Sequence, residues 1–190
     1  MRSHPHGLND VAEETPANVV NFWRDAGPQQ WFRKNAAFDR RFRERFFAAH
    51  MAASRREFDG WAAAPEGALA LLILLDQYPR NAFRGTGHMY ATDALARRIA
   101  HEMIAAGFDC QIDTDLRVFC YLPFAHSEEL ADQQRSVEFN RQLGRPWLDH
   151  AKAHRRIIDR FGRFPHRNAM LGRDTTPEEL RFLKQGGFAG

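Results

Sequence analysis

Apolar residues recur along this chain at intervals of three to four positions, which is the period of an α-helix. Phe38, Phe42 and Phe46 follow one another at four-residue steps, so a helix through them carries all three on one face. The opposite face of the same stretch is rich in arginine. No segment alternates polar and apolar residues for long enough to predict a strand. The pattern therefore predicts an all-α fold.

Capping residues mark the ends of several predicted helices. Thr15 is a typical N-cap with Pro16 in the first turn, and Gly27 is expected to end that helix. Thr176 and Pro177 form a second start of the same kind. We also predict helices over 68–75, 92–106, 113–124 and 146–161, together with one that Ser127 caps, for a total of about eight.

Prolines suggest how these helices are connected. The stretch 68–75 is apolar on all sides, which is typical of a helix buried at the centre of a core. Pro79 is expected to end this helix, and Pro123 and Pro165 are expected to break later segments. The three prolines lie 44 and 42 residues apart, a spacing that suits a repeated helical hairpin. We therefore expect a tetratricopeptide-like array of antiparallel helical hairpins.

Length and composition indicate one domain. The 190 residues, 44% hydrophobic with 16 Phe, are ample for a single core, which we place in residues 15–190 after a flexible segment 1–14. The longest apolar run is far shorter than the roughly 20 residues that span a bilayer, and the N-terminus lacks the apolar core of a secretory signal. Cys110 and Cys120 suit neither a disulfide framework nor a ligand set. We expect a cytoplasmic protein without a membrane partner.

The charge balance bears on possible partners. Lys and Arg exceed Asp and Glu by 27 − 24 = 3, whereas a nucleic-acid-binding protein usually has a larger or more segregated excess. RNA binding through the Arg- and Phe-rich stretch 160–167 is therefore the weakest of the hypotheses. Nearly all the basic residues are arginines, which suit bidentate recognition of carboxylate or phosphate and suit buried ion pairs equally well.

The densest polar string, 76–85, follows the most apolar helix. Its candidate site residues are Asp76, Arg80, Asn81 and Arg84, which together could form one wall of an anion-binding cleft. The structural alternative is that the arginines cover the terminal carbonyls of the helix and pair with Asp76. The sequence does not separate these two interpretations.

Two further strings follow the later prolines. In 121–129, His126 precedes a predicted helix start, where it could donate a proton or bind an anion, and Glu128 lies beside it. In 160–168, arginine alternates with phenylalanine before a Pro-His-Arg-Asn turn. A local hydrogen bond near the helix cap and a tightly packed turn are the structural alternatives for these two strings. The candidates from the third string are Arg163, His166, Arg167 and Asn168.

Motifs for metal or covalent chemistry are not evident. His150 and His154 are four residues apart, but Ala151 stands where a zinc protease needs its glutamate. His154 also belongs to the apolar stripe of its helix, so a hydrogen-bonded core histidine is the better interpretation. Neither a glycine-rich phosphate loop nor a Cys-His nucleophile pair is visible. We predict no metal and no cofactor.

Several of these strings, taken together and in order, resemble one known family. They are residues 31–32, 65–70, 76–85, 121–128, 132–133 and 162–168. The chain is similar over about 16–183 to the bacterial family catalogued as domain of unknown function 924. The resemblance implies a fold of tetratricopeptide-like helical repeats and assigns no activity to any residue.

Two hypotheses for the function remain. The first is a binding or interaction module whose Arg-, His- and Asn-lined cleft takes a small anionic ligand or an acidic peptide. The second is an enzyme that uses His126 or His166 as acid or base, arginines for charge stabilisation and Asp76 to orient them. The enzyme hypothesis requires that two of these groups meet within hydrogen-bond reach in a concave pocket.

Overall fold

The computed structural model describes residues 14–188, and these residues form helices and connecting turns without a strand. The predicted flexible segment 1–14 falls, except for its last residue, outside the described residues. The α-helices are α1 Pro16–Ala26, α2 Pro28–Trp31, α3 Ala36–Ser54, α4 Pro65–Leu72, α5 Tyr78–Ala82, α6 Asp93–Ala105, α7 Thr114–Ala125, α8 Leu130–Leu143, α9 Trp147–Phe161 and α10 Pro177–Lys184. Short 3₁₀ turns lie at Asp59–Ala63, Gly87–Tyr90, Asp109–Gln111 and Pro165–Arg167.

The predicted helix ends are confirmed where capping chemistry is strongest. The Thr15 hydroxyl accepts a hydrogen bond from the Asn18 amide, and Gly27 takes φ +72° at the end of α1. At α10, Thr176 and Glu179 form a reciprocal capping box. These ends could be predicted because each depends on residues within one turn of the boundary.

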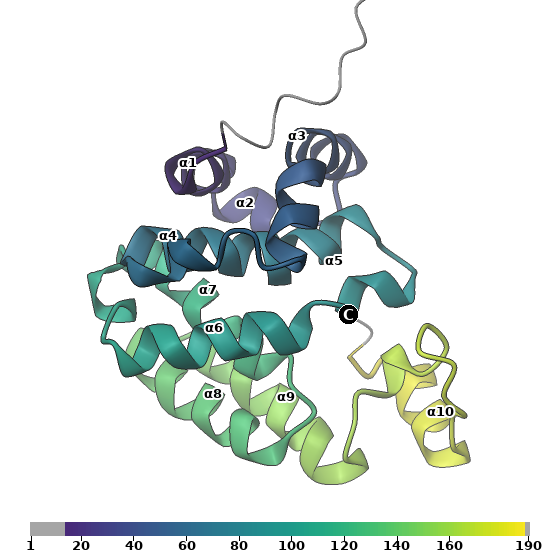
Figure 1. The fold of residues 1–190 in the computed structure, drawn as a ribbon. Coiled ribbons are helices and arrows are strands. Elements are labelled where there is room, and N and C mark those ends of the chain that lie inside the picture. Colours follow the sequence, from purple (N-terminus) through teal and green to yellow (C-terminus); the bar gives the residue numbers. More distant parts are fainter. Residues whose placement is uncertain (1–13, 189–190) are drawn as a thin grey trace, which may run out of the picture.

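The helix that is apolar all round is indeed the centre of the core, but Pro79 does not end it. Helices α4 and α5 are joined by a π-helical turn at Ile73–Gln77, so the chain stays helical from residue 65 to residue 82. Figure 1 shows this helix between α1–α3 on one side and α6–α9 on the other. Its residues 68–75 are at most 1% exposed.

Aromatic side chains fill the side of the core that faces α1–α3. Trp23 packs edge-on against Phe119, at 5.4 Å between ring centroids, and Phe42 lies 5.2 Å from Trp23. Phe38, Phe42 and Phe46 all point inward and are at most 4% exposed. The shared face predicted for these three residues is therefore the buried face of α3.

The later helices stack in order, since α6 contacts α7, α7 contacts α8, and α8 contacts α9. Pro123 lies inside α7 and does not break it, because the helix continues to Ala125. The arrangement is compatible with the predicted tetratricopeptide-like hairpins, and that finer description stays a prediction. Among residues 14–188, no helix is both long enough and apolar enough to cross a membrane.

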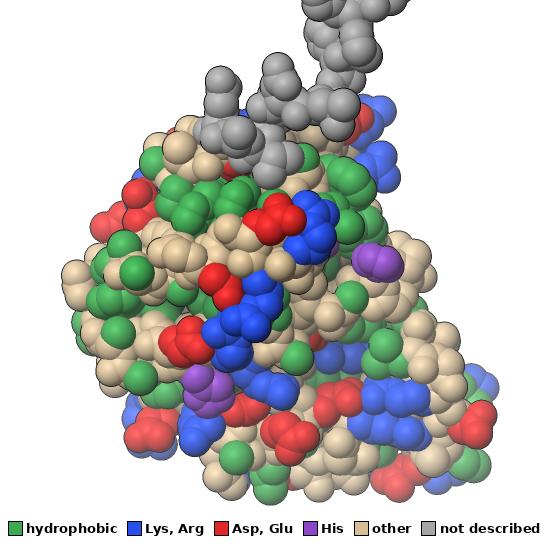
Figure 2. Space-filling model, viewed as in Figure 1, with side chains coloured by type: hydrophobic (Ala, Val, Ile, Leu, Met, Phe, Trp, Pro, Cys, Tyr) green, Lys and Arg blue, Asp and Glu red, His purple; other side chains and the backbone are tan. Residues whose placement is uncertain are grey.

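The C-terminal segment has a small core of its own. Ile157 and Ile158 of α9 pack with Phe164, and Phe161 and Phe182 cover them. Helix α10 consequently lies beside the end of α9 and apart from the main stack (Figure 1). Figure 2 shows the surface indented between this segment and the main body, with basic and acidic side chains in the indentation.

Candidate functional site

The π-helical turn sets the geometry of the site. The Tyr78 amide bonds to the Ile73 carbonyl at a spacing of five residues, and Pro79 has no N–H to donate. The carbonyls of Leu74 and Leu75 therefore lack their usual helical donors. His50 Nδ1 lies 2.9 Å from the Leu74 oxygen, and the Thr92 hydroxyl donates to the Leu75 oxygen. These side-chain partners let a buried helix pass through Pro79 without leaving carbonyls unsatisfied.

Asp76 lies in this turn and is 1% exposed. Its Oδ1 is 2.8 Å from His126 Nδ1 and 3.2 Å from an Arg80 nitrogen, while Gln77 Nε2 donates to Oδ2 at 2.7 Å. Burial on its own raises the pKa of Asp76. The charge of Arg80 and the hydrogen bonds outweigh that effect and hold the pKa below its ordinary value, so the carboxylate is ionised.

His126 follows the last residue of α7, and the buried Gln133 amide holds the chain there. Gln133 Nε2 donates to the carbonyl oxygens of Ala125 at 2.9 Å and Ser127 at 2.6 Å. Burial and the nearby charge of Arg80 lower the pKa of His126, so its imidazole is neutral at pH 7. An ionised Asp76 only accepts hydrogen bonds, so His126 Nδ1 carries the proton and Nε2 holds the lone pair.

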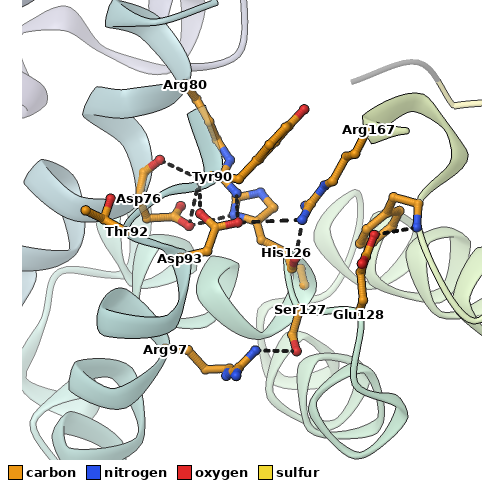
Figure 3. Close-up of polar contacts among 12 residues, drawn as sticks. Asp76, Arg80, Tyr90, Thr92, Asp93, Arg97, His126, Ser127, Glu128 and Arg167 are labelled. Carbon is orange, nitrogen blue, oxygen red and sulfur yellow. Dashed lines mark hydrogen bonds and ion pairs between the residues drawn. The ribbon is translucent and has the colours of Figure 1, made fainter. Parts of the chain in front are cut away.

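Two arginines from different strings share one carboxylate beside this pair (Figure 3). Arg80 donates to both oxygens of Asp93, at 2.9 and 3.0 Å, whereas Arg167 approaches Asp93 only to 3.6 Å. Arg167 also donates to the His126 carbonyl oxygen at 2.9 Å. Its guanidinium stacks against the rings of Tyr90 and Phe164, at 4.5 and 4.6 Å from their centroids. Arg167 is thus the less completely paired of the two arginines.

Some residues from each of the three polar strings therefore lie together in space. Asp76, Arg80, His126 and Arg167 form one cluster, which we call the dyad site after its Asp76–His126 pair. Glu128 lies next to it, where its carboxylate accepts from the Phe164 amide at 2.8 Å and pairs with Arg173 at 2.7 Å. Ser127 does not cap a helix as predicted, since α8 begins at Leu130 and the Ser127 hydroxyl donates to Asp132.

The remaining candidates lie elsewhere. Arg163 and Asn168 both bind Glu179 and hold the C-terminal turn together. His166 packs against Phe164 and Phe188 rather than facing Asp76. Asn81 and Arg84 lie on the opposite side of the helix from Asp76, where Arg84 pairs with Asp39 of α3. Only some of the candidate residues therefore lie together in the structure.

Sequence reasoning missed three members of the cluster. They are Asp93, Tyr90 and Arg173. Asp93 follows Thr92 at a helix start, so in the sequence it looks like an ordinary first-turn acid. Tyr90 lies in a short glycine-rich connection with no periodicity. Nothing in the local sequence pairs Asp93 with Arg80, 13 residues away, or Arg173 with Glu128, 45 residues away.

The charges in this region balance. The three arginines 80, 167 and 173 face the three carboxylates of Asp76, Asp93 and Glu128. Arg80 and Arg167, which the sequence suggested as anion ligands, are therefore already paired with carboxylates in the folded chain. Within the described residues, no group of three His, Cys, Asp or Glu side chains has the geometry to hold a metal ion.

Comparison with known proteins places the chain in a family. It is similar to a solved structure, the protein of unknown function ATU0120 from Agrobacterium tumefaciens, with 57% identity and a TM-score of 0.89. That match covers 90% of this chain and 97% of the other. A search of curated proteins found no match. A family model described as "Bacterial protein of unknown function (DUF924)" matches residues 19–187. The chain belongs to this bacterial family.

Proposed function

We propose that the chain is an enzyme in which His126 acts as a general base, positioned by Asp76. The observation that carries the proposal is the 2.8 Å contact between the buried Asp76 carboxylate and Nδ1 of a neutral histidine. This contact orients the ring and leaves the Nε2 lone pair to take a proton. A carboxylate that fixes the tautomer and orientation of a histidine is the arrangement that general-base catalysis needs.

The proton would come from a water molecule that attacks the substrate. Among residues 14–188, no side-chain nucleophile stands ready beside the dyad: the Thr92 and Ser127 hydroxyls donate to Leu75 and Asp132, and the Cys120 thiol is fully buried. Water attack on an electrophilic carbon transfers one proton to Nε2, which returns it to the leaving group. The proposed reaction class is hydrolysis of a small substrate.

Arg167 would stabilise the negative charge that develops during this step. Its guanidinium is buried, Nε has no hydrogen-bond partner among the described residues, and its carboxylate contact is long at 3.6 Å. Such a group gains a charge-assisted hydrogen bond when an anionic oxygen arrives. Arg80, which holds both Asp93 oxygens, instead keeps that carboxylate in place.

Tyr90 offers the substrate a hydroxyl. In Figure 3 its oxygen points away from the bonded network, and its polar contact in the structure is the distant Met170 sulfur at 3.9 Å. Burial raises the pKa of Tyr90, so the hydroxyl keeps its proton and can donate. Tyr90, Arg167 and His126 Nε2 are therefore the groups that we expect to touch the substrate.

The test is a hydrolase panel of small esters, amides and lactones, with His126→Gln and a matched His150→Gln control. His150 is exposed on α9 and makes no side-chain hydrogen bond among residues 14–188. We expect the His126 variant to lose about 10²–10⁴-fold in kcat and the control to keep its rate. Nitrogen-15 NMR provides a measurement that needs no substrate. A protonated Nε2 at pH 7, or hydrolysis unchanged in the His126 variant, would contradict the proposal.

A second candidate is a binding module without turnover. The partly paired Arg167 favours it, because an anionic ligand or acidic peptide terminus could displace its long contact to Asp93. This function predicts a rise in melting temperature with a carboxylate or phosphate ligand that the Arg167→Gln variant loses, while His126→Gln retains it. An equal loss in both variants favours the enzyme instead. A protein partner and a cytoplasmic location remain predictions from the sequence.

A further inference from the structure

A concave surface lies on the side of the Asp76-bearing helix that faces α3. It is a concavity of about 290 Å³ between α3 and α5, lined mainly by Asp39, Arg40 and Arg43 of α3 and by Asn81 and Arg84. None of these five residues contributes to the dyad site. We call this surface the arginine concavity.

The arginines of the concavity differ in how they are held. Arg84 donates to Asp39 Oδ2 at 2.7 Å and to the Asn81 side-chain oxygen at 2.9 Å, which fixes its guanidinium at the wall. Arg40 and Arg43 are exposed, and within residues 14–188 neither forms a side-chain hydrogen bond or an ion pair. Their three-residue spacing places them on one face of α3.

The charge of the lining favours a doubly negative ligand. Three arginines and one aspartate give 3 − 1 = +2 over a small concavity. A phosphate monoester carries close to two negative charges at pH 7 and presents several acceptor oxygens. Arginine binds such oxygens with parallel N–H donors, and the fixed Arg84 lessens the ordering that binding requires.

We propose that the arginine concavity binds the phosphate group of a small metabolite. Its volume is at the low end of the range for ligand pockets, so it takes a phosphate and little of what is attached. The site is independent of the general-base chemistry proposed for His126. A carboxylate, with one negative charge, satisfies the lining less completely.

The experiment is calorimetric titration of the full chain with inorganic phosphate and with a sugar phosphate. The test variant is Arg40→Gln/Arg43→Gln, which removes two exposed and unpaired charges and should fold normally. We expect its dissociation constants to rise at least tenfold. An Arg141→Gln/Arg156→Gln control removes the same charge from exposed positions on α8 and α9 and should bind as the unaltered protein does.

A third variant tests the charge argument in the opposite direction. Asp39→Asn removes the negative charge of the lining and keeps a side-chain oxygen that can accept a hydrogen bond from Arg84, so phosphate should bind several-fold more tightly. The inorganic phosphate and sugar phosphate arms show whether the free ion suffices, and binding of either one at the concavity supports the proposal. The phosphate-binding proposal would be overturned by equal weakening in the test and control variants or by no binding of either probe. Tight binding of heparin without binding of either phosphate probe would also overturn it. None of these results depends on hydrolysis by the dyad site.

Discussion

The dyad site and the arginine concavity lie on opposite sides of one helix and hold their charges in different ways. In the dyad site Asp76 and Arg167 are buried and Arg80 is half-buried, and each has a charged or hydrogen-bonding partner. In the concavity Arg40 and Arg43 face solvent without partners in the described chain. Burying an unpaired charge costs free energy, so charged side chains in the interior need partners. Charged side chains at the surface do not, because water solvates them. Pairing suits a pre-organised reaction site, and free charge suits capture of an ion.

The largest expected effect is a difference in how much stability the protein loses when one carboxylate is removed from each region. Asp76→Ala leaves Arg80 and His126 without their shared buried partner, so we expect the free energy of unfolding to fall by about 3–5 kcal/mol. Asp39→Ala breaks the more exposed pair with Arg84 and should cost under about 1 kcal/mol. Urea denaturation of both variants measures the difference. Equal losses would show that burial is not what distinguishes the two regions.

Acid should weaken the C-terminal part of the molecule, where His154 and His166 pack against Phe164 and Phe188. Burial lowers the pKa of His154 to about 3 and that of His166 to about 4, so the unfolded chain binds more protons than the folded chain between those values and 6.5. Stability is therefore complete above pH 6.5 and falls with pH below it, by up to about 1.4 kcal/mol per pH unit for each histidine.

Urea midpoints at pH 7.5 and pH 5.5 measure this loss. His154→Phe keeps an aromatic ring against Phe164 and Phe188 without a titrating nitrogen, so it should reduce the slope. Sulfate can replace phosphate as the probe here, because it keeps two negative charges over this pH range. Its binding at the concavity should not change, because the lining contains no histidine. A pH slope that His154→Phe leaves intact would exclude this residue as a source of the acid sensitivity.

A smaller effect concerns the amides that support each region. Gln133→Ala leaves the carbonyls of Ala125 and Ser127 without a buried donor, which should cost about 1–3 kcal/mol and disorder His126. Asn81→Ala removes a bond to a helix carbonyl and one contact to Arg84, so its cost should be smaller. Thermal unfolding and the His126 NMR signal report the two effects. A sharp, unchanged His126 signal in the Gln133 variant would show that other contacts position the ring.

The smallest expected effect is that of salt on the charged groups of the dyad site. Exposed charges are screened over about 8 Å at physiological ionic strength, whereas buried pairs are screened much less. Raising sodium chloride from low to high concentration should therefore weaken phosphate binding at the concavity and leave the pKa of His126 nearly unchanged. Calorimetry measures phosphate binding and NMR titration measures the pKa of His126. A similar sensitivity of both to salt would contradict the proposed difference between the two regions.

The fold was largely predictable because its signals are local. The aromatic face at 38–46, the all-apolar stretch 68–75 and the capping pairs at both ends of the chain depend on neighbours within one or two turns. Pro79 was misjudged for a complementary reason. Its effect depends on whether distant side chains can bond the freed carbonyls, and Thr92 and His50 do so.

The candidate site shows the same limit. The sequence singled out Asp76, Arg80, His126 and Arg167 as chemically capable, because acid, base and guanidinium groups are visible as residue types. Helix packing alone brought these residues together with Asp93 and decided that Arg80 and Arg167 share its carboxylate. Helix packing also placed Asn81 and Arg84 on the opposite side. Ion pairs between residues far apart in sequence have no periodicity, and the turn of a buried helix decides which side chain faces which neighbour.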